Sequence, residues 1–357
     1  MTGMTPSRPL SGSGVPSGPS RLDPPSRPSV ASVPPLADLL EQAHVVRVPL
    51  RVRFRGVTRR EGMLLRGPAG WGEFAPFVEY EDAQAARWLA AAIEAAWVGP
   101  PASVREVVPV NATVPAVPAV AVADVLARFD GCRTAKVKVA ESGQAMGDDL
   151  DRVAAVRDQM GDAARIRVDA NGAWSVDQAR DALARLAAYD LEYAEQPCAS
   201  VEELAALRIA LARAGVNVPI AADESIRQAE DPLLVRDLDA ADVIVIKVAP
   251  LGGARAALRI VQDCGLPAVV SSALDTSVGL ASGLAVAAAL PALPYDCGLG
   301  TAALLWGDVV AQPLLPVGGL LPVREVSPDP ALVEAFAPPP SRVLWWQERL
   351  SRCHALL

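Results

Sequence analysis

The stretch TAKVKVA, Thr134 to Ala140, places two lysines two residues apart inside a short run of valine and alanine. This composition is typical of a buried β-strand, in which successive side chains point to opposite faces. Lys136 and Lys138 therefore share one face of the strand, and Val137 and Val139 share the other. Because lysine is almost never fully buried without a partner, the lysine face must meet charged or polar groups inside the fold.

Short apolar stretches of this kind recur along the chain, separated by amphipathic helical patterns. Their spacing of roughly 25 to 30 residues is that of one βα unit. Eight such units that close on themselves predict an α/β fold, a (β/α)8-type barrel over residues 109–312. The eight predicted strands are PVNATV (109–114), TAKVKVA (134–140), RIRVDA (165–170), LEYAEQ (191–196), PIAADE (219–224), DVIVIKV (242–248), PAVVSS (267–272) and YDCGL (295–299).

Two helices of the predicted barrel carry their own start and stop signals. Ser175 with Gln178, and Ser200 with Glu203, form the spacing of a capping box. Gly215 is placed to end the second of these helices.

The segments around the barrel have a different character. Residues 35–108 alternate like strands and contain one helical pattern, DAQAARWLAAAIEAAW, which predicts a small α+β capping domain. Residues 1–34 are rich in Pro, Ser and Gly and predict a disordered tail. Residues 313–357 end in RVLWWQERLSRCHALL, a predicted helix expected to return toward the capping domain.

Composition excludes several classes of function. The chain has 357 residues and a net charge of −8, without a basic tract to follow a phosphate backbone, so a nucleic acid partner is not expected. No apolar run reaches the roughly 18 residues of a membrane span, and the start lacks a signal-peptide pattern, so a cytoplasmic protein is expected. The five cysteines form no CxxC pair and there are only two histidines, which leaves Lys, Asp and Glu for acid–base chemistry.

Five consecutive predicted strands have a charged residue at or near their carboxyl end, on the inward-facing parity. In a barrel these side chains converge on the mouth where barrel enzymes keep their active sites. Three carboxylates held together repel one another unless a cation compensates them, and oxygen ligands alone favour Mg²⁺, with Mn²⁺ as a substitute. The five residues are Lys138, Asp169, Glu195, Asp223 and Lys247.

Each of the carboxylates has an ordinary interpretation when taken alone. Asp169 in VDANGAW fits a turn, Glu195 a loop before proline, and Asp223 a helix cap. Lys136 fits a structural cation, paired for example with Asp169. Their joint occurrence in register on successive strands favours a site.

The chemistry of this set is proton abstraction. A lysine near a metal and another cation has its ammonium form disfavoured, so its pKa falls toward neutrality and it can act as a general base. Removal of a proton next to a carboxylate builds negative charge on the carboxylate oxygens, which a bound cation stabilises as an enediolate.

The motifs KVK, VDANGAW, EQP, ADES and IKVAPLGG together resemble the enolase superfamily, in the subgroup with lysines on the second and sixth barrel strands. More narrowly, RFRG, GWGEFAPF, VNATVPAV, GCRTAKVKVAE, SSALDTSVGLA and CGLGT resemble the o-succinylbenzoate synthase family of the menaquinone pathway. The resemblance runs from about Val45 to Pro313 and implies the fold predicted above.

The resemblance implies a Mg²⁺-dependent dehydration of 2-succinyl-6-hydroxy-2,4-cyclohexadiene-1-carboxylate to 2-succinylbenzoate. It assigns Lys138 to take the proton next to the carboxylate and return it to the departing hydroxide. It assigns Lys247 to face Lys138 across the substrate and stabilise the intermediate, or to take the complementary proton role. Metal would be held by Asp169, Glu195 and Asp223. The expected substrate contacts are Lys136, Arg55, Ser271, Ser272, Gly298 and Gly300.

Two other functions stay open at this stage. An N-succinylamino acid racemase or dipeptide epimerase would also need two opposed lysines. A barrel that binds a metabolite without turnover is the third reading, although a complete set of lysines and carboxylates speaks against it. The expected partner is a small-molecule carboxylate, and the oligomeric state is open.

Overall fold

The computed structural model describes residues 1–2, 33–54, 56–228 and 231–357. Most of the tail predicted at 1–34 and the predicted substrate contact Arg55 lie outside these ranges. Pro34–Leu357 form one compact unit, which contains every helix and strand described below. None of the helices in the described ranges is both long and apolar enough to cross a membrane.

A three-stranded antiparallel sheet with strand order β1-β2-β3 occupies the region predicted as α+β. Its strands are β1 (Ala43–Phe54), β2 (Val57–Gly67) and β3 (Gly70–Phe74). The predicted helix is α2 (Asp82–Ile93), which a π-helical turn η1 (Glu94–Val98) extends up to Gly99. Gly72 is required where α2 crosses β3, because a Cβ there would collide with the backbone of Ala92.

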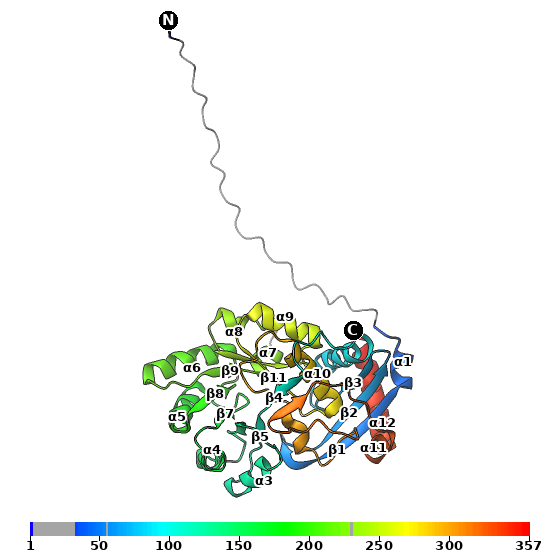
Figure 1. Cartoon of the computed structure of the whole chain (residues 1–357), viewed down its shortest axis with the longest axis horizontal. Helices are drawn as coiled ribbons and strands as arrows, with labels where there is room; N and C mark the ends of the chain where they lie inside the picture. Colours follow the sequence, from blue (N-terminus) through cyan, green and yellow to red (C-terminus); the bar gives the residue numbers. More distant parts are fainter. Residues whose placement is uncertain (3–32, 55, 229–230) are drawn as a thin grey trace. The chain divides into compact units, whose positions relative to one another are not determined.

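A seven-stranded parallel sheet curls into the barrel, with strand order β11-β10-β9-β8-β7-β6-β5 (Figure 1). This confirms the predicted fold class, since each strand falls within one of the first seven predicted stretches. The strands are β5 (Ala112–Val114), β6 (Thr134–Lys138), β7 (Arg165–Asp169), β8 (Leu191–Glu195), β9 (Ile220–Ala222), β10 (Val243–Lys247) and β11 (Ala268–Ser271).

The eighth predicted strand, 295–299, is reduced to two isolated parallel bridges. Cys297 pairs with Val110, ahead of β5, and Gly298 pairs with Ser271 at the end of β11. Backbone bonds of 2.8 Å from Cys297 N to Pro109 O and from Gly298 N to Val270 O accompany them. The segment therefore joins both edges of the sheet, but the prolines before it and Gly298 within it limit the ladder.

The start of the first predicted barrel strand is also different. Residues Val107–Pro109 form β4, which pairs antiparallel with β12 (Leu320–Pro322) in a separate two-stranded sheet. Only the second half of PVNATV therefore belongs to the parallel sheet.

Helices follow the barrel strands as the pattern predicts. Ser175 with Gln178 and Ser200 with Glu203 form the two predicted capping boxes, and Gly215, at φ 67°, ends the second helix. The helices of the barrel region are α3 (Val122–Leu126), α4 (Met146–Met160), α5 (Val176–Leu186), α6 (Val201–Ala214), α7 (Glu224–Arg227), α8 (Leu234–Asp237), α9 (Ala254–Cys264) and α10 (Ser277–Ala289).

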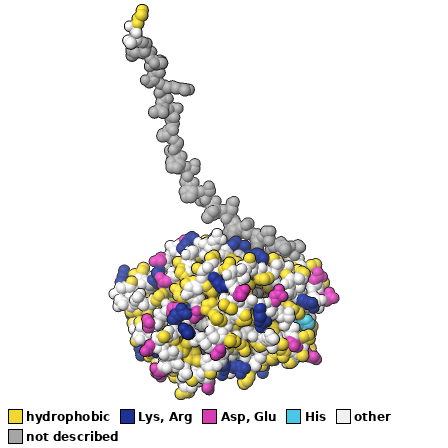
Figure 2. Space-filling model, viewed as in Figure 1, with side chains coloured by type: hydrophobic (Ala, Val, Ile, Leu, Met, Phe, Trp, Pro, Cys, Tyr) yellow, Lys and Arg dark blue, Asp and Glu magenta, His cyan; other side chains and the backbone are white. Residues whose placement is uncertain are grey.

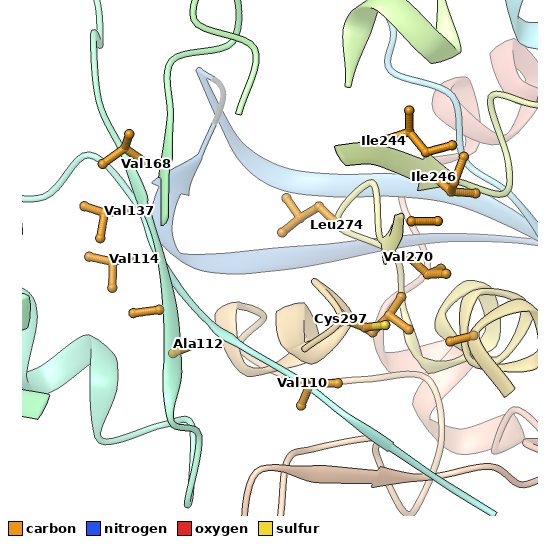
Figure 3. Close-up of a cluster of buried hydrophobic side chains, with 14 of the residues drawn as sticks. Val110, Ala112, Val114, Val137, Val168, Ile244, Ile246, Val270, Leu274 and Cys297 are labelled. Atoms are coloured by element: carbon orange, nitrogen blue, oxygen red, sulfur yellow. The ribbon is translucent and has the colours of Figure 1, made fainter. Parts of the chain in front are cut away.

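The strands alternate as their sequence predicts. Val114, Val137 and Val168 project from the same side of three neighbouring strands into the main core (Figure 3). The opposite faces hold the charged side chains at the carboxyl ends, together with a smaller apolar cluster that includes Tyr193 and Val245. On the face in Figure 2, acidic and basic side chains are interspersed.

The C-terminal helix α12 (Pro340–His354) lies against α2, near the short helix α1 (Leu36–Glu41) (Figure 1). It is preceded by α11 (Pro330–Ala335). Arg349 of α12 is buried and donates to the backbone oxygens of Phe77 at 3.1 Å and Tyr80. The end of the chain thus holds the loop that follows β3.

Glu73 on β3 links the three-stranded sheet to the barrel. Its buried carboxylate accepts hydrogen bonds from the backbone nitrogens of Thr276 at 3.1 Å and Gly279 at 2.9 Å, at the start of α10. Burial, and then the neighbouring Asp275, raise the pKa of Glu73 to about 7.

We expect this contact to make stability depend on pH. An unfolded chain releases the Glu73 proton near pH 4.5 and the folded chain near pH 7, so the folded state binds more protons in between. Stability should therefore fall as pH rises across that window and level off above it. Glu73→Gln removes this component, so its urea-unfolding free energy should fall less than that of the wild type between about pH 5 and pH 8. Equal slopes for both proteins would contradict the expectation; Glu202→Gln, at an exposed position of α6, is the control.

Candidate active site

The carboxyl ends of β6 to β10 bring together the charged residues that the sequence singled out. Strand register places Lys138 beside Asp169, and Asp169 beside Glu195. Asp223 directly follows β9, and Lys247 ends β10. Together with Lys136, these two lysines are all the lysines that the chain contains.

Ion pairs connect the lysines to the carboxylates. Lys136 Nζ lies 2.7 Å from Glu195 Oε1 and 3.1 Å from Asp169 Oδ2. Lys138 Nζ lies 2.6 Å from Asp169 Oδ2, and Lys247 pairs with Asp223. The three carboxylate residues are at most 1% exposed, so the lysine face of β6 meets buried partners inside the barrel.

The lysines differ in basicity because their partners differ. Burial lowers the pKa of Lys138, and the attraction of Asp169 does not restore it. Burial also acts on Lys136, but Glu195 and Asp169 outweigh it and raise the pKa of Lys136 well above its usual value. Lys138 is therefore the better proton acceptor of the two.

The carboxylates are also unequal. Burial opposes the charged form of Asp169, yet Lys138 and Lys136 hold its pKa well below the usual range. Burial, and then Asp169, raise the pKa of Glu195 to about 7 although Lys136 contacts it. An additional cation at this position would favour the charged form of Glu195.

The donor set fits a hard divalent cation in its chemistry. Asp169, Glu195 and Asp223 offer only oxygen atoms, from three adjacent strand ends. In the described ranges no three Asp, Glu, His or Cys side chains are gathered closely enough to hold an ion, because lysine ammonium groups lie between these carboxylates. A bound cation would have to replace some of the ion pairs by which the lysines now neutralise the carboxylate charge.

A pocket with about 530 Å³ of free space opens above these groups. One wall is aromatic and comes from β1, the loop after β3, and α2. The opposite wall includes the predicted contacts Ser271, Ser272 and Gly298. Gly300 is not among the lining residues; it is buried against Asn111 and Phe129. The pocket is also lined by Phe54, Phe77, Tyr80, Trp88, Lys136, Lys138, Asn171, Arg227 and Lys247.

Several site residues were not found from the sequence. Asn171 accepts a hydrogen bond of 2.6 Å from Lys138 Nζ, and Gln196 accepts from the backbone nitrogens of Asp223 at 2.9 Å and Ser225 at 3.2 Å. Asn171 carries a signal, because it stands two residues after Asp169 and beside a glycine, where asparagine tolerates its observed φ of 47°. Gln196, at φ 39°, lies inside the motif EQP, but its role depends on the neighbouring strand.

The opposite pKa directions of Lys138 and Lys136 predict the order in which these two lysines titrate. With lysine ¹³C-labelled at Cε, metal-free protein in EDTA should give three signals, assigned by single Lys→Arg variants. The Lys138 signal should titrate below the usual lysine range, while Lys136 should stay in its charged position throughout the accessible alkaline range. The reverse order would contradict the electrostatics described here.

Comparison with known proteins bears on both halves of the fold. Residues 45–96 match the family described as enolase N-terminal domain-like, and residues 119–328 match that described as enolase C-terminal domain-like. The chain is 58% identical over 326 residues to the o-succinylbenzoate synthase of Mycolicibacterium smegmatis, with coverage of 91% of this chain and 99% of that protein.

Solved structures agree with the fold. Muconate lactonizing enzyme from Pseudomonas fluorescens, in complex with muconolactone, has a TM-score of 0.70 at 23% identity, over 83% of this chain and 97% of that one. N-succinyl Arg/Lys racemase from Bacillus cereus has a TM-score of 0.68 at 18% identity, over 83% and 96%. With the near-complete match at 58% identity, these findings place the chain in the o-succinylbenzoate synthase family of the enolase superfamily.

Proposed function

We propose that this chain converts 2-succinyl-6-hydroxy-2,4-cyclohexadiene-1-carboxylate to 2-succinylbenzoate, as a cytoplasmic step of menaquinone biosynthesis. One observation carries the proposal: every lysine of the chain is gathered with three buried carboxylates at a single pocket. The 58% identity to a named o-succinylbenzoate synthase supports it.

The domains divide this work. We propose a capping domain over residues 35–108, a catalytic barrel over 109–312, and a C-terminal segment over 313–357 that supports the capping domain. The barrel supplies the charged groups, and the capping domain supplies the aromatic wall of the pocket.

Lys138 acts as the base. Its amine takes the proton from the carbon next to the substrate carboxylate, and the electron pair of that C–H bond moves onto the carboxylate as an enediolate. When the electrons return, the C–O bond to the hydroxyl breaks, and Lys138 gives its proton to the departing hydroxide, which leaves as water. The ring becomes aromatic, so this step is strongly favourable.

Asp169, Glu195 and Asp223 would hold Mg²⁺, or Mn²⁺ in its place, at the substrate carboxylate. Such a cation stabilises the negative charge that develops on the carboxylate oxygens. Lys136, held against Glu195, keeps positive charge beside them.

Lys247 faces Lys138 across the pocket, because β10 and β6 are the sixth and second of eight positions around the barrel. It stabilises the negative intermediate from the opposite side. Ser271, Ser272 and Gly298 line the pocket, which supports their proposed contact with the succinyl arm. Arg55 and Gly300 stay predictions from sequence.

The opposed lysines also favour a second reaction, the racemisation of N-succinylamino acids or the epimerisation of dipeptides. In such a reaction one lysine removes the α-proton and the other returns a proton from the opposite face. The two activities use the same charged groups and differ in what the pocket walls accept.

The test is the loss of cyclohexadiene absorbance when purified protein is added with Mg²⁺, repeated with EDTA. N-succinylamino acids are followed in parallel by polarimetry. Rapid, metal-dependent dehydration with little racemisation is the expected result. Racemisation without dehydration would overturn the proposed reaction in favour of the second candidate.

Lys138→Met should abolish turnover while leaving the fold intact. Methionine keeps the unbranched chain of lysine without its terminal amine and cannot accept the proton, so the loss should be about 10³-fold or more in kcat. The measurement is steady-state dehydration, with circular dichroism and Mg²⁺ titration to establish that the protein is folded. A variant with near-normal kcat would refute the role of Lys138 as the base.

Asp223→Asn should weaken Mg²⁺ binding by at least about tenfold, because a neutral amide oxygen replaces one charged ligand. Calorimetric titration of the metal-free protein measures this directly. Asp263→Asn, at an exposed position of α9, is the matched control. An unchanged affinity in Asp223→Asn would remove that residue from the ligand set.

A further inference from the structure

Arg227, at the end of α7, makes three contacts with one buried guanidinium group. Its Nε donates to Asp223 Oδ1 at 3.0 Å, and a terminal nitrogen pairs with Glu224. The other terminal nitrogen donates to the hydroxyl of Tyr80 at 2.9 Å. The side chain is 2% exposed, so water screens these contacts little.

Tyr80 reaches Arg227 from a distant part of the chain. It lies in the loop after β3, where its ring packs against Phe77 at 5.8 Å and Trp88 at 6.2 Å between centroids. Arg349 of α12 donates to the backbone oxygens at both ends of this loop, Phe77 and Tyr80. The Tyr80 hydroxyl is therefore carried on a supported loop and contacts the barrel through Arg227.

The contacts of Arg227 extend to the proposed base. Glu224 Oε1, its partner, also accepts from Asn171 Nδ2 at 3.3 Å. Asn171 in turn accepts from Lys138 Nζ. Arg227 thus stands between the capping loop on one side and the surroundings of Asp223 and Lys138 on the other.

We propose that Arg227 is a positioning residue that couples the seating of the loop Phe77–Tyr80 to the orientation of the Asp223 carboxylate. Arg227 holds Oδ1 of Asp223, which directs Oδ2 toward Lys247 and the pocket. Tyr80 fixes the guanidinium plane by holding its other edge. A lysine cannot replace this group, because one ammonium cannot make three planar contacts in a fixed geometry.

The consequence is that the carboxylate is fully oriented only when the capping loop is in place. This inference rests on the proposed function in one respect, that Asp223 is a metal-holding residue. It adds a residue that contacts both Asp223 and the capping loop, and so a route from that loop to the proposed metal site.

The test measures Mn²⁺ binding without substrate, by the electron paramagnetic resonance signal of free Mn²⁺. Four proteins are compared: wild type, Tyr80→Phe, Arg227→Lys and the double variant. Tyr80→Phe keeps the ring contacts and removes only the hydroxyl, so it should fold normally. Tyr189→Phe, at a half-buried position outside the pocket, is the matched control.

We expect Arg227→Lys to weaken Mn²⁺ binding about 10- to 100-fold. Tyr80→Phe alone should weaken it about fivefold, and in the Arg227→Lys background it should add less than about twofold, since the coupling is already lost. Unchanged binding in Tyr80→Phe, multiplicative effects in the double variant, or a wild type that does not bind Mn²⁺ would overturn the coupling.

The dehydration assay on the same proteins separates this inference from the proposed reaction. If the four proteins show the expected non-additive effects on Mn²⁺ binding but the wild type does not dehydrate the cyclohexadiene, the proposed reaction is overturned and the coupling is supported. Wild type that dehydrates it, with independent effects of the two substitutions on Mn²⁺ binding, would overturn the coupling alone.

Discussion

Mutual compensation of buried charge at the barrel mouth is the interaction on which the rest of the structure depends. An isolated ion in a protein interior costs several kcal/mol, so every member of the set needs a partner. Asp169 has two lysines, Glu195 has Lys136, and Asp223 has Lys247 and Arg227. Among these, only Glu195 relies on a single ion-pair partner in the described ranges, Lys136. Burial lowers the pKa of Lys138, and its pairing with Asp169 opposes that shift.

The alternation of the strands makes this arrangement possible without loss of the core. Valine and isoleucine on one face of β5 to β11 form the main hydrophobic core with the helices (Figure 3). The opposite face can therefore hold charged side chains without loss of that core. Below the charged groups, Tyr193 and its apolar neighbours close the barrel interior. Next to Tyr193, buried Arg167 pairs with Glu192 and donates to the backbone oxygen of Asp296, so a second polar network lies at the other end of the barrel.

The parts of this structure that sequence predicts are those fixed by local rules. Strand parity, the capping boxes and the charged strand ends depend on neighbours within a few residues, and they appear where predicted. The eighth strand failed because proline and glycine limit it to two bridges. Gln196, Arg227 and Tyr80 were missed because their partners come from other strands or from the capping loop. That all the lysines of the chain lie at the site could have been noticed from the sequence, since no lysine occurs elsewhere.

The two candidate reactions differ in the substrate that the pocket walls must accept. Dehydration and racemisation would use the same lysines and carboxylates, so these charged groups do not distinguish the two candidate reactions. The aromatic wall comes instead from the loop Phe77–Tyr80 and α2, and α12 supports that loop through Arg349. Residues near the C-terminus, far from the reacting atoms, therefore help shape the wall that a substrate meets. Because Tyr80 also holds Arg227, a change in that wall should alter the orientation of Asp223 in the proposed metal site as well, which would link substrate selection to catalysis.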